Sequence, residues 1–182
     1  MKFLTVCSLF LWPAGAVAPL KDARLHIPKA VKRHEDAVLR CEYDMEGDRL
    51  YQIKWYKSQH EFFRFTPGEE SPIKVFAVKG ITVDKDRSNN RQVTLHKVEM
   101  SAEGRYACEV SADMPSFATS VIEDFLTVVE VPRRAPNLSG LQARYKIGDL
   151  LRANCTSDPS HPPANLTISI NGQQVRIDTA KR

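Results

Sequence analysis

The stretch Glu103-Gly104-Arg105-Tyr106-Ala107-Cys108 places a tyrosine two residues before a cysteine. This spacing is typical of a tyrosine corner, in which the ring packs inside a β-sandwich and the hydroxyl donates to a backbone carbonyl a few residues upstream. A second strand-like stretch, Ala37-Val38-Leu39-Arg40-Cys41, ends in another cysteine. Because side chains alternate along a strand, Leu39 and Cys41 share one face, which is inward if the cysteine joins two sheets. We therefore expect Cys41 and Cys108 to point into one core.

A tryptophan lies between these two cysteines, in the stretch Tyr51-Gln52-Ile53-Lys54-Trp55-Tyr56-Lys57. Strand alternation places Ile53 and Trp55 on one face and the side chains of Gln52, Lys54 and Tyr56 on the other. Trp55 and Tyr106 are therefore the predicted core residues beside a Cys41–Cys108 disulfide.

The rest of the chain from Leu25 onward consists of short alternating segments broken by turn residues, without a sustained helical pattern. The predicted class is all-β. The interval between Trp55 and Cys108 has room for about four extra strands at the usual spacing of strands and turns. The candidates are residues 62–65, 74–77, 81–84 and 92–95. This count favours a variable-type immunoglobulin-like β-sandwich with nine strands.

The N-terminus has the pattern of a signal peptide, which we assign to residues 1–18. Met1-Lys2 precedes an apolar run, and Ala16-Val17-Ala18 supplies small residues for cleavage. A signal peptide predicts a secreted or extracellular cell-surface protein, in which cysteines are oxidised. Cys7 leaves with the signal. Cys155 then has three open alternatives: a cysteine beyond this chain, a cysteine of another molecule, or a free thiol.

A second unit follows the first domain, which we place at residues 19–132. In residues 133–182, the stretch 147–155 repeats the approach to a first sandwich cysteine, Ile168 takes the place of the tryptophan, and Asn171-Gly172 predicts a hairpin turn. No second cysteine follows, so we expect an incomplete second immunoglobulin-like domain. All three glycosylation sequons lie in this part of the chain, at Asn137, Asn154 and Asn165.

Composition and motifs argue against several other functions. The 26 lysines and arginines are interspersed with 22 aspartates and glutamates, whereas nucleic-acid binding needs a concentrated basic surface. The histidines are scattered and neither HExxH nor GxSxG occurs, so we expect no enzyme and no small-molecule substrate. No cysteine–histidine cluster has zinc spacing, and Asp84-Lys85-Asp86 offers too few oxygens for calcium. We expect neither a metal nor a cofactor.

Several stretches resemble the beaten path family of insect immunoglobulin-superfamily proteins: residues 50–57, Glu61-Phe62-Phe63-Arg64-Phe65, residues 108–117, residues 144–149 and Asn154-Cys155-Thr156. The resemblance implies a neuronal role in adhesion and axon guidance, with heterophilic binding of sidestep-family ectodomains through the first domain. One departure is Ala102, which stands where the general immunoglobulin motif has aspartate. Glu103 is the residue that would partly substitute for it.

The candidate partner-binding surface is the outward side of the sheet that contains Trp55. Six of the 15 aromatic residues fall between Tyr51 and Phe65, and Phe62, Phe63 and Phe65 cannot all face inward on a regularly alternating strand. At least one exposed aromatic is therefore expected there, in a patch of the kind that anchors protein partners. The predicted binding residues are Gln52, Lys54, Tyr56, Phe63, Phe65, Glu109, Ser111, Asp113 and Phe117.

Two functions compete at this point. The leading hypothesis is extracellular heterophilic protein recognition in adhesion and axon guidance. The alternative is a soluble immune-type factor that binds microbial surfaces or glycans. Binding to a cell-surface ectodomain would favour the first, and binding to lipopolysaccharide or cell-wall material the second.

Overall fold

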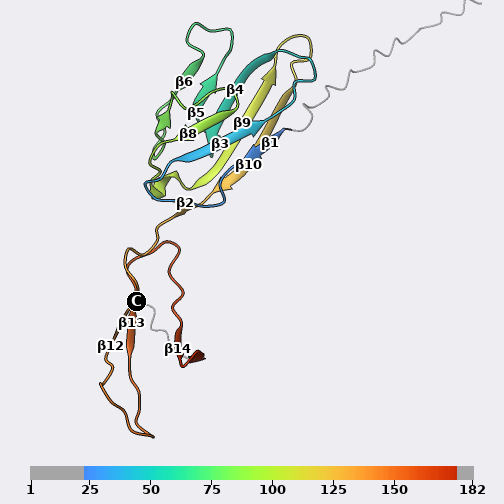
Figure 1. Ribbon diagram of the computed structural model, residues 1–182. Coiled ribbons are helices and arrows are strands. Elements are labelled where there is room, and N and C mark those ends of the chain that lie inside the picture. The colour runs from blue at the N-terminus through green and yellow to red at the C-terminus, as the bar shows by residue number, and fades with distance from the viewer. Residues whose placement is uncertain (1–22, 176–182) are drawn as a thin grey trace, which may run out of the picture.

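The computed structural model describes residues 23–175. Strands β1 to β11 form the upper body of the molecule in Figure 1, where two sheets face each other. Among these described residues there is one short 3-10 helix, η1 (Met100–Ala102), and no α-helix, so the all-β prediction is confirmed. The predicted signal peptide, with Cys7, lies outside the described residues.

Both sheets are antiparallel throughout. The first has the order β1-β3-β8-β7 and the second has the order β10-β9-β4-β5-β6. A short parallel pair joins β2 to β11. The bounds are β1 (Arg24–His26), β2 (Val31–Lys32), β3 (Ala37–Glu42), β4 (Leu50–Lys57), β5 (His60–Phe65), β6 (Ile73–Val75), β7 (Val83–Asp84), β8 (Gln92–Leu95), β9 (Gly104–Ala112), β10 (Thr119–Leu126) and β11 (Val128–Val129).

This arrangement confirms the variable-type sandwich. The four extra segments expected from the sequence overlap β5, β6, β7 and β8, so the two sheets together hold nine strands. The five-stranded sheet gains β5 and β6 beside β4, which broadens its outward side. A wide outward side matters for function because it offers area for a partner.

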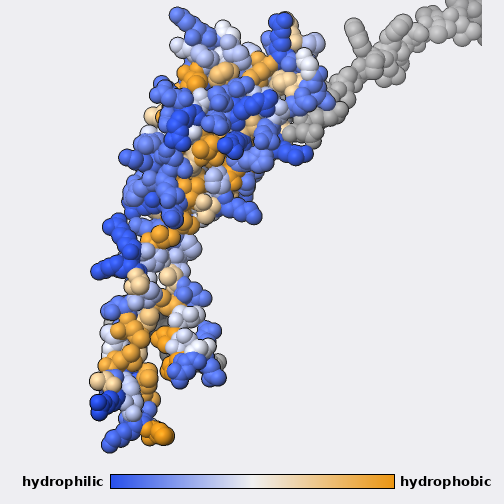
Figure 2. All heavy atoms as spheres, in the orientation of Figure 1, coloured by the Kyte–Doolittle hydropathy of each residue, from blue (hydrophilic) through white to orange (hydrophobic). Residues whose placement is uncertain are grey.

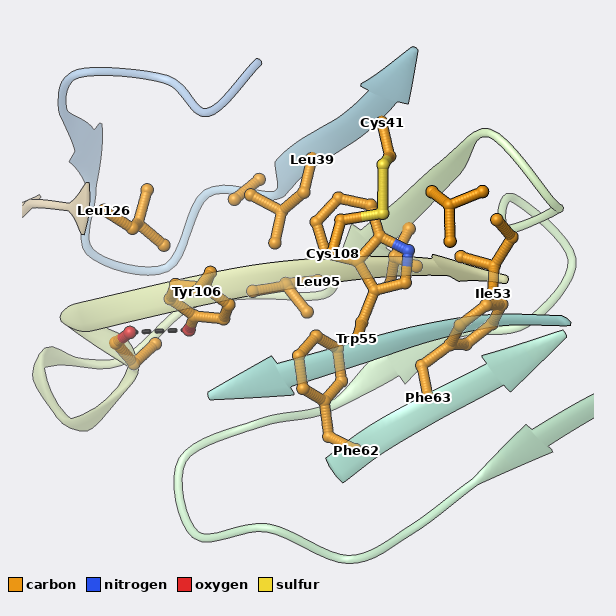
Figure 3. Packing of buried hydrophobic residues seen from close by; sticks show 14 of the residues in the cluster. Leu39, Cys41, Ile53, Trp55, Phe62, Phe63, Leu95, Tyr106, Cys108 and Leu126 are labelled. Atoms are coloured by element: carbon orange, nitrogen blue, oxygen red, sulfur yellow. Dashed lines mark hydrogen bonds between the residues drawn. A yellow bond between two sulfur atoms is a disulfide. The ribbon is translucent and has the colours of Figure 1, made fainter. Parts of the chain in front are cut away.

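The core between the sheets is built around the disulfide that joins Cys41 to Cys108. Trp55 lies beside it and is fully buried, as is Tyr106 (Figure 3). Strand alternation explains this packing, because every second residue of β3, β4 and β9 points between the sheets. The other fully buried large apolar side chains are Leu39, Ile53, Phe62, Phe63, Val93, Leu95, Val110, Leu126 and Val128.

A β-bulge in β5 overturns one prediction about the binding surface. Phe62 and Phe63 are consecutive residues, yet both have 0% exposure. Phe63 pairs with Trp55, and the next pair along the ladder uses Glu61, so Phe62 is an extra residue that interrupts the alternation. Both rings therefore enter the core (Figure 3), and Phe65 packs against the same core, half-buried. The prediction that Phe63 faces a partner is wrong.

The tyrosine corner is present at the start of β9. The Tyr106 hydroxyl donates to the carbonyl oxygen of Ala102 at 2.6 Å, inside the protein. Because this bond uses the backbone of residue 102, it does not need the aspartate that other immunoglobulin domains carry there. The Glu103 carboxylate accepts a hydrogen bond from the backbone N–H of Val128 at 3.0 Å. Glu103 thus ties the corner to β11.

Replacing Tyr106 by phenylalanine removes the buried hydrogen bond, and we expect the free energy of unfolding to fall by about 1–3 kcal/mol near neutral pH. Burial raises the pKa of Tyr106 above its ordinary value. Above about pH 10 the phenol therefore ionises in the unfolded chain before it does so in the folded one, and the stability that Tyr106 contributes is lost as pH rises toward the raised pKa. Denaturant titrations of the wild type and of Tyr106→Phe at about pH 8 and about pH 11 measure this. The difference between their free energies of unfolding should be smaller at the higher pH. An equal difference in free energy of unfolding at the two pH values would contradict this explanation.

The chain beyond β11 forms two separate hairpins. β12 (Asn137–Ser139) pairs with β13 (Asn154–Thr156), and β14 (Ile168–Ile170) pairs with β15 (Gln173–Val175). Asn171 and Gly172 have φ values of 50° and 80°, so they close the second hairpin at the predicted turn. Cys155 is a half-buried free thiol. Exposed apolar side chains give this segment its orange areas in Figure 2: Leu138, Leu141, Ile147, Leu150, Leu151 and Ile170.

Contacts among the described residues connect this segment to the sandwich and hold its own parts together. The His161 ring nitrogen lies 3.9 Å from the Glu103 carboxylate. Glu130 and His161 exchange backbone hydrogen bonds of 2.9 and 2.8 Å. Arg134 forms a two-point ion pair with Asp158, with distances of 3.1 and 2.8 Å. That residues 133–182 make a second immunoglobulin-like domain stays a prediction.

Candidate protein-recognition face

The outward side of the five-stranded sheet, which we call the sheet face, carries a connected polar triad. The ammonium of Lys54 lies 3.2 Å from Glu109 Oε1, and the Tyr56 hydroxyl donates to Glu109 Oε2 at 3.1 Å. Lys54 and Tyr56 alternate with inward residues of β4, and Glu109 lies opposite Lys54 on β9. Since each side chain is positioned by a central strand, the triad is already ordered in the free protein.

The electrostatics of the triad fix its protonation states. Burial and then the charge of Glu109 raise the pKa of Tyr56. Partial burial acts to lower the pKa of Lys54, but the hydrogen bond and the charge of Glu109 outweigh it, and the net effect raises that pKa. At physiological pH Lys54 is therefore a cation and Tyr56 a neutral hydroxyl.

A second ion pair extends the triad toward β5. Arg64 lies opposite Lys54 on the neighbouring strand. Its guanidinium forms two parallel hydrogen bonds with the Glu61 carboxylate, of 2.7 and 2.9 Å, and lies 5.5 Å from the centre of the Phe76 ring. Planar two-point pairs of this kind hold an arginine in one orientation, which favours specific recognition.

Strand β10 adds apolar side chains that the sequence prediction missed. Val121 lies opposite Glu109 and is 60% exposed, and Phe125 farther along the same strand is 47% exposed. Between them, Glu123 pairs with Arg105 of β9 at 2.8 Å. The sequence contains part of the signal, because Thr119, Val121, Glu123 and Phe125 alternate with the other residues of the strand. Which of the two sets faces outward depends on the register with β9, where Ile122 pairs with Cys108.

The loop between β9 and β10 continues the sheet face at one end. Met114 and Phe117 are 70% and 65% exposed, the highest values for large apolar side chains in residues 23–130. The loop is fastened at its base, where the backbone N–H of Asp113 donates to the carbonyl of Arg49 at 2.8 Å and Ser116 bonds to Asp48. Asp113 is half-buried, so Phe117 and Met114 form the tip.

The predicted binding residues therefore divide into three groups. Lys54, Tyr56 and Glu109 lie together on the sheet face, with Gln52 on the same strand. Ser111, opposite Gln52, is only 8% exposed and accepts a hydrogen bond from Thr119 at 3.2 Å. The remaining predicted residues are Asp113 and Phe117 in the loop, Phe63 in the core, and Phe65, which is half-buried against the core.

The glycosylation sequons lie outside the sheet face, and the potential metal ligands of the described residues do not cluster. Asn137, Asn154 and Asn165 are exposed and follow the sandwich, so the sheet face contains no sequon. Their glycosylation remains a prediction. Within residues 23–175 there is no group of three His, Cys, Asp or Glu side chains placed to hold a metal ion. That same part of the chain includes no helix with the length and apolar character of a membrane span.

Comparison with known proteins identifies the family of the sandwich. The family model described as Immunoglobulin V-set domain matches residues 27–125. Cell adhesion molecule 2 of Homo sapiens is 23% identical over 176 residues, which cover 97% of this chain and 37% of the relative. Cell adhesion molecule 3 of Xenopus laevis is 31% identical over 130 residues, which cover 71% of this chain and 30% of the relative. The chain thus spans about a third of the length of these relatives.

Solved structures agree on the fold. The crystal structure of murine CEACAM1b aligns with a TM-score of 0.62 at 19% identity, covering 85% of this chain and 77% of that one. Similarity at this level of identity supports the architecture alone. What the sheet face binds must therefore be argued from its own residues.

Proposed function

The chain belongs to the immunoglobulin V-set family, and we propose that it is a secreted or cell-surface protein that recognises another protein through the sheet face. The adhesion molecules to which it is similar support a role in cell adhesion. The finer proposal is heterophilic recognition in axon guidance, with a sidestep-like immunoglobulin-superfamily ectodomain as partner, which follows from the resemblance to the beaten path family.

The observation that carries the proposal is the position of Val121 on β10, opposite a member of the polar triad. Val121 is 60% exposed directly beside Glu109, whose carboxylate is held by Lys54 and Tyr56. Protein interfaces combine apolar anchors, aromatic residues and arginine with polar groups that set orientation. The sheet face supplies each of these, and its ordered ion pairs limit the side-chain entropy that binding would cost.

A binding screen of the secreted chain against cell-surface ectodomains tests the proposal. Once a partner is found, Val121→Asp should weaken its binding by roughly 30-fold or more, because the new carboxylate would be buried beside Glu109 without a counter-ion. Val131→Asp is the matched control, since Val131 is 50% exposed but lies in the linker after β11. Surface plasmon resonance would measure both affinities.

Two results would count against the proposal. Equal affinities of V121D and the wild type, with circular dichroism showing an intact fold, would remove the sheet face from the interface. Binding to lipopolysaccharide or cell-wall fragments without binding to any ectodomain would favour the soluble immune-type function instead.

A further inference from the structure

A hollow at one end of the sandwich is lined by cationic and hydroxyl side chains. Its volume is about 490 Å³, which lies in the range of small-ligand sites. No Asp or Glu is among the residues that line it. Three separate segments build it: the turn between β4 and β5, the loop that follows β6, and η1. Its polar lining consists of Lys57, Ser58, His60, Lys79 and Ser101, and we call it the basic hollow.

Lys57 is the unusual member of this set. Its side chain is half-buried, and its ammonium donates to the carbonyl oxygen of Ser101, yet no carboxylate pairs with it within residues 23–175. Burial is the cause that lowers the pKa of Lys57. Lys54, on the same strand, differs because its ammonium forms an ion pair with Glu109. A partly desolvated ammonium without a counter-ion is costly, and a bound anion would offset that cost.

The wall of the basic hollow is held tightly in place. Gly80 has φ of 81°, and a Cβ atom there would lie 2.4 Å from the Ser101 hydroxyl oxygen. The loop after β6 can therefore approach η1 this closely only because residue 80 is glycine. Lys79, the residue before Gly80, is thereby placed in the lining of the same hollow as Lys57.

We propose that the basic hollow binds an anionic saccharide that carries sulfate or carboxylate groups. Lysine ammonium groups and the His60 ring provide donors for oxyanions, and two serine hydroxyls match sugar hydroxyls. Ala77 and Val78 complete the lining with small apolar groups that suit the face of a sugar ring. The volume exceeds the need of a single inorganic ion, which favours a sugar-sized ligand.

This site is distinct from the sheet face. Lys57 lies opposite Tyr106 near the start of β9, whereas the Met114–Phe117 tip follows the other end of that strand. Val121 lies on β10, and no residue of β10 lines the basic hollow. Val121→Asp should leave saccharide binding unchanged, so failure of one proposal is distinguishable from failure of the other.

The test measures binding of the full chain to three probes: a heparin-derived sulfated oligosaccharide, a non-sulfated oligosaccharide of uronic acids, and inorganic sulfate. The double variant K57Q/K79Q should bind the oligosaccharide at least about tenfold more weakly, because two charge-assisted contacts are lost. The matched control is K29Q/K85Q, which removes the same charge from two exposed lysines outside the basic hollow. K79Q alone provides a variant at an exposed position in case K57Q disturbs folding.

The proposal is supported if K57Q/K79Q or K79Q binds either oligosaccharide more weakly than the wild type while K29Q/K85Q does not. The oligosaccharide that is affected shows which anionic group is preferred. Three outcomes overturn it: no binding of either oligosaccharide, equal weakening in K29Q/K85Q, or displacement of the oligosaccharide by inorganic sulfate at equal molar concentration. The second outcome would indicate attraction by net charge, and the third a simple anion site.

Discussion

Replacing Cys41 and Cys108 together by alanine will lower the free energy of unfolding of the sandwich by about 4 kcal/mol. The bond closes a loop with a sequence separation of 67 residues, and opening it returns that conformational freedom to the unfolded chain. Small domains have a net stability of roughly 5–15 kcal/mol, so this loss removes between about a quarter and four-fifths of the free energy of unfolding. Denaturant titration followed by far-ultraviolet circular dichroism measures the change.

The control for this experiment is Cys155→Ala. Cys155 is a free, half-buried thiol beyond the sandwich, so its replacement should leave the unfolding transition of the sandwich in place. A loss confined to the double variant assigns the stability to the cross-link. If the double variant unfolded at the same denaturant concentration as the wild type, the core would not depend on the disulfide.

The core could be predicted from the sequence because its signals are local or strictly periodic. Alternation around Cys41, Trp55 and Cys108 determines which side chains point inward, and the tyrosine two residues before Cys108 marks the corner. These features also determined the strand count, because the interval between the tryptophan and the second cysteine has to be filled by strands of ordinary length.

The bulge at Phe62 could not be predicted in this way. A bulge inserts one residue without changing composition, and the stretch His60-Glu61-Phe62-Phe63-Arg64-Phe65 fits regular alternation until its partner strand is known. The register with β4 depends on contacts between the two strands. As a consequence, Phe63 was assigned to the surface although it lies in the core.

The basic hollow was missed for a different reason. Lys57, Lys79 and Ser101 are far apart in the sequence, and each looks like an ordinary surface residue in its own segment. Only the folded chain shows that one of them is half-buried without a carboxylate. Sites assembled from several loops leave no periodic pattern, so sequence reasoning finds strands more readily than it finds such sites.

Replacing Trp55 is the second substitution that should strongly lower the free energy of unfolding. The structure allows the packing of its ring to be considered separately from its indole N–H. The side chain has 0% exposure and lies opposite Cys108 on one side and Phe63 on the other. Its indole N–H has no hydrogen-bond partner within residues 23–175. Trp55→Ala should therefore cost about 3–5 kcal/mol through the cavity that it leaves, with no hydrogen bond lost.

Trp55→Phe distinguishes this explanation from a polar one. Phenylalanine keeps much of the ring volume and removes the unpaired N–H, which is itself unfavourable inside a core. We expect Trp55→Phe to cost well under half of what Trp55→Ala costs, measured by the same denaturant titration. If the two substitutions destabilised the sandwich equally, the indole N–H would have to be making an interaction that matters more than its packing, and the core would not be held by the ring that lies against the disulfide.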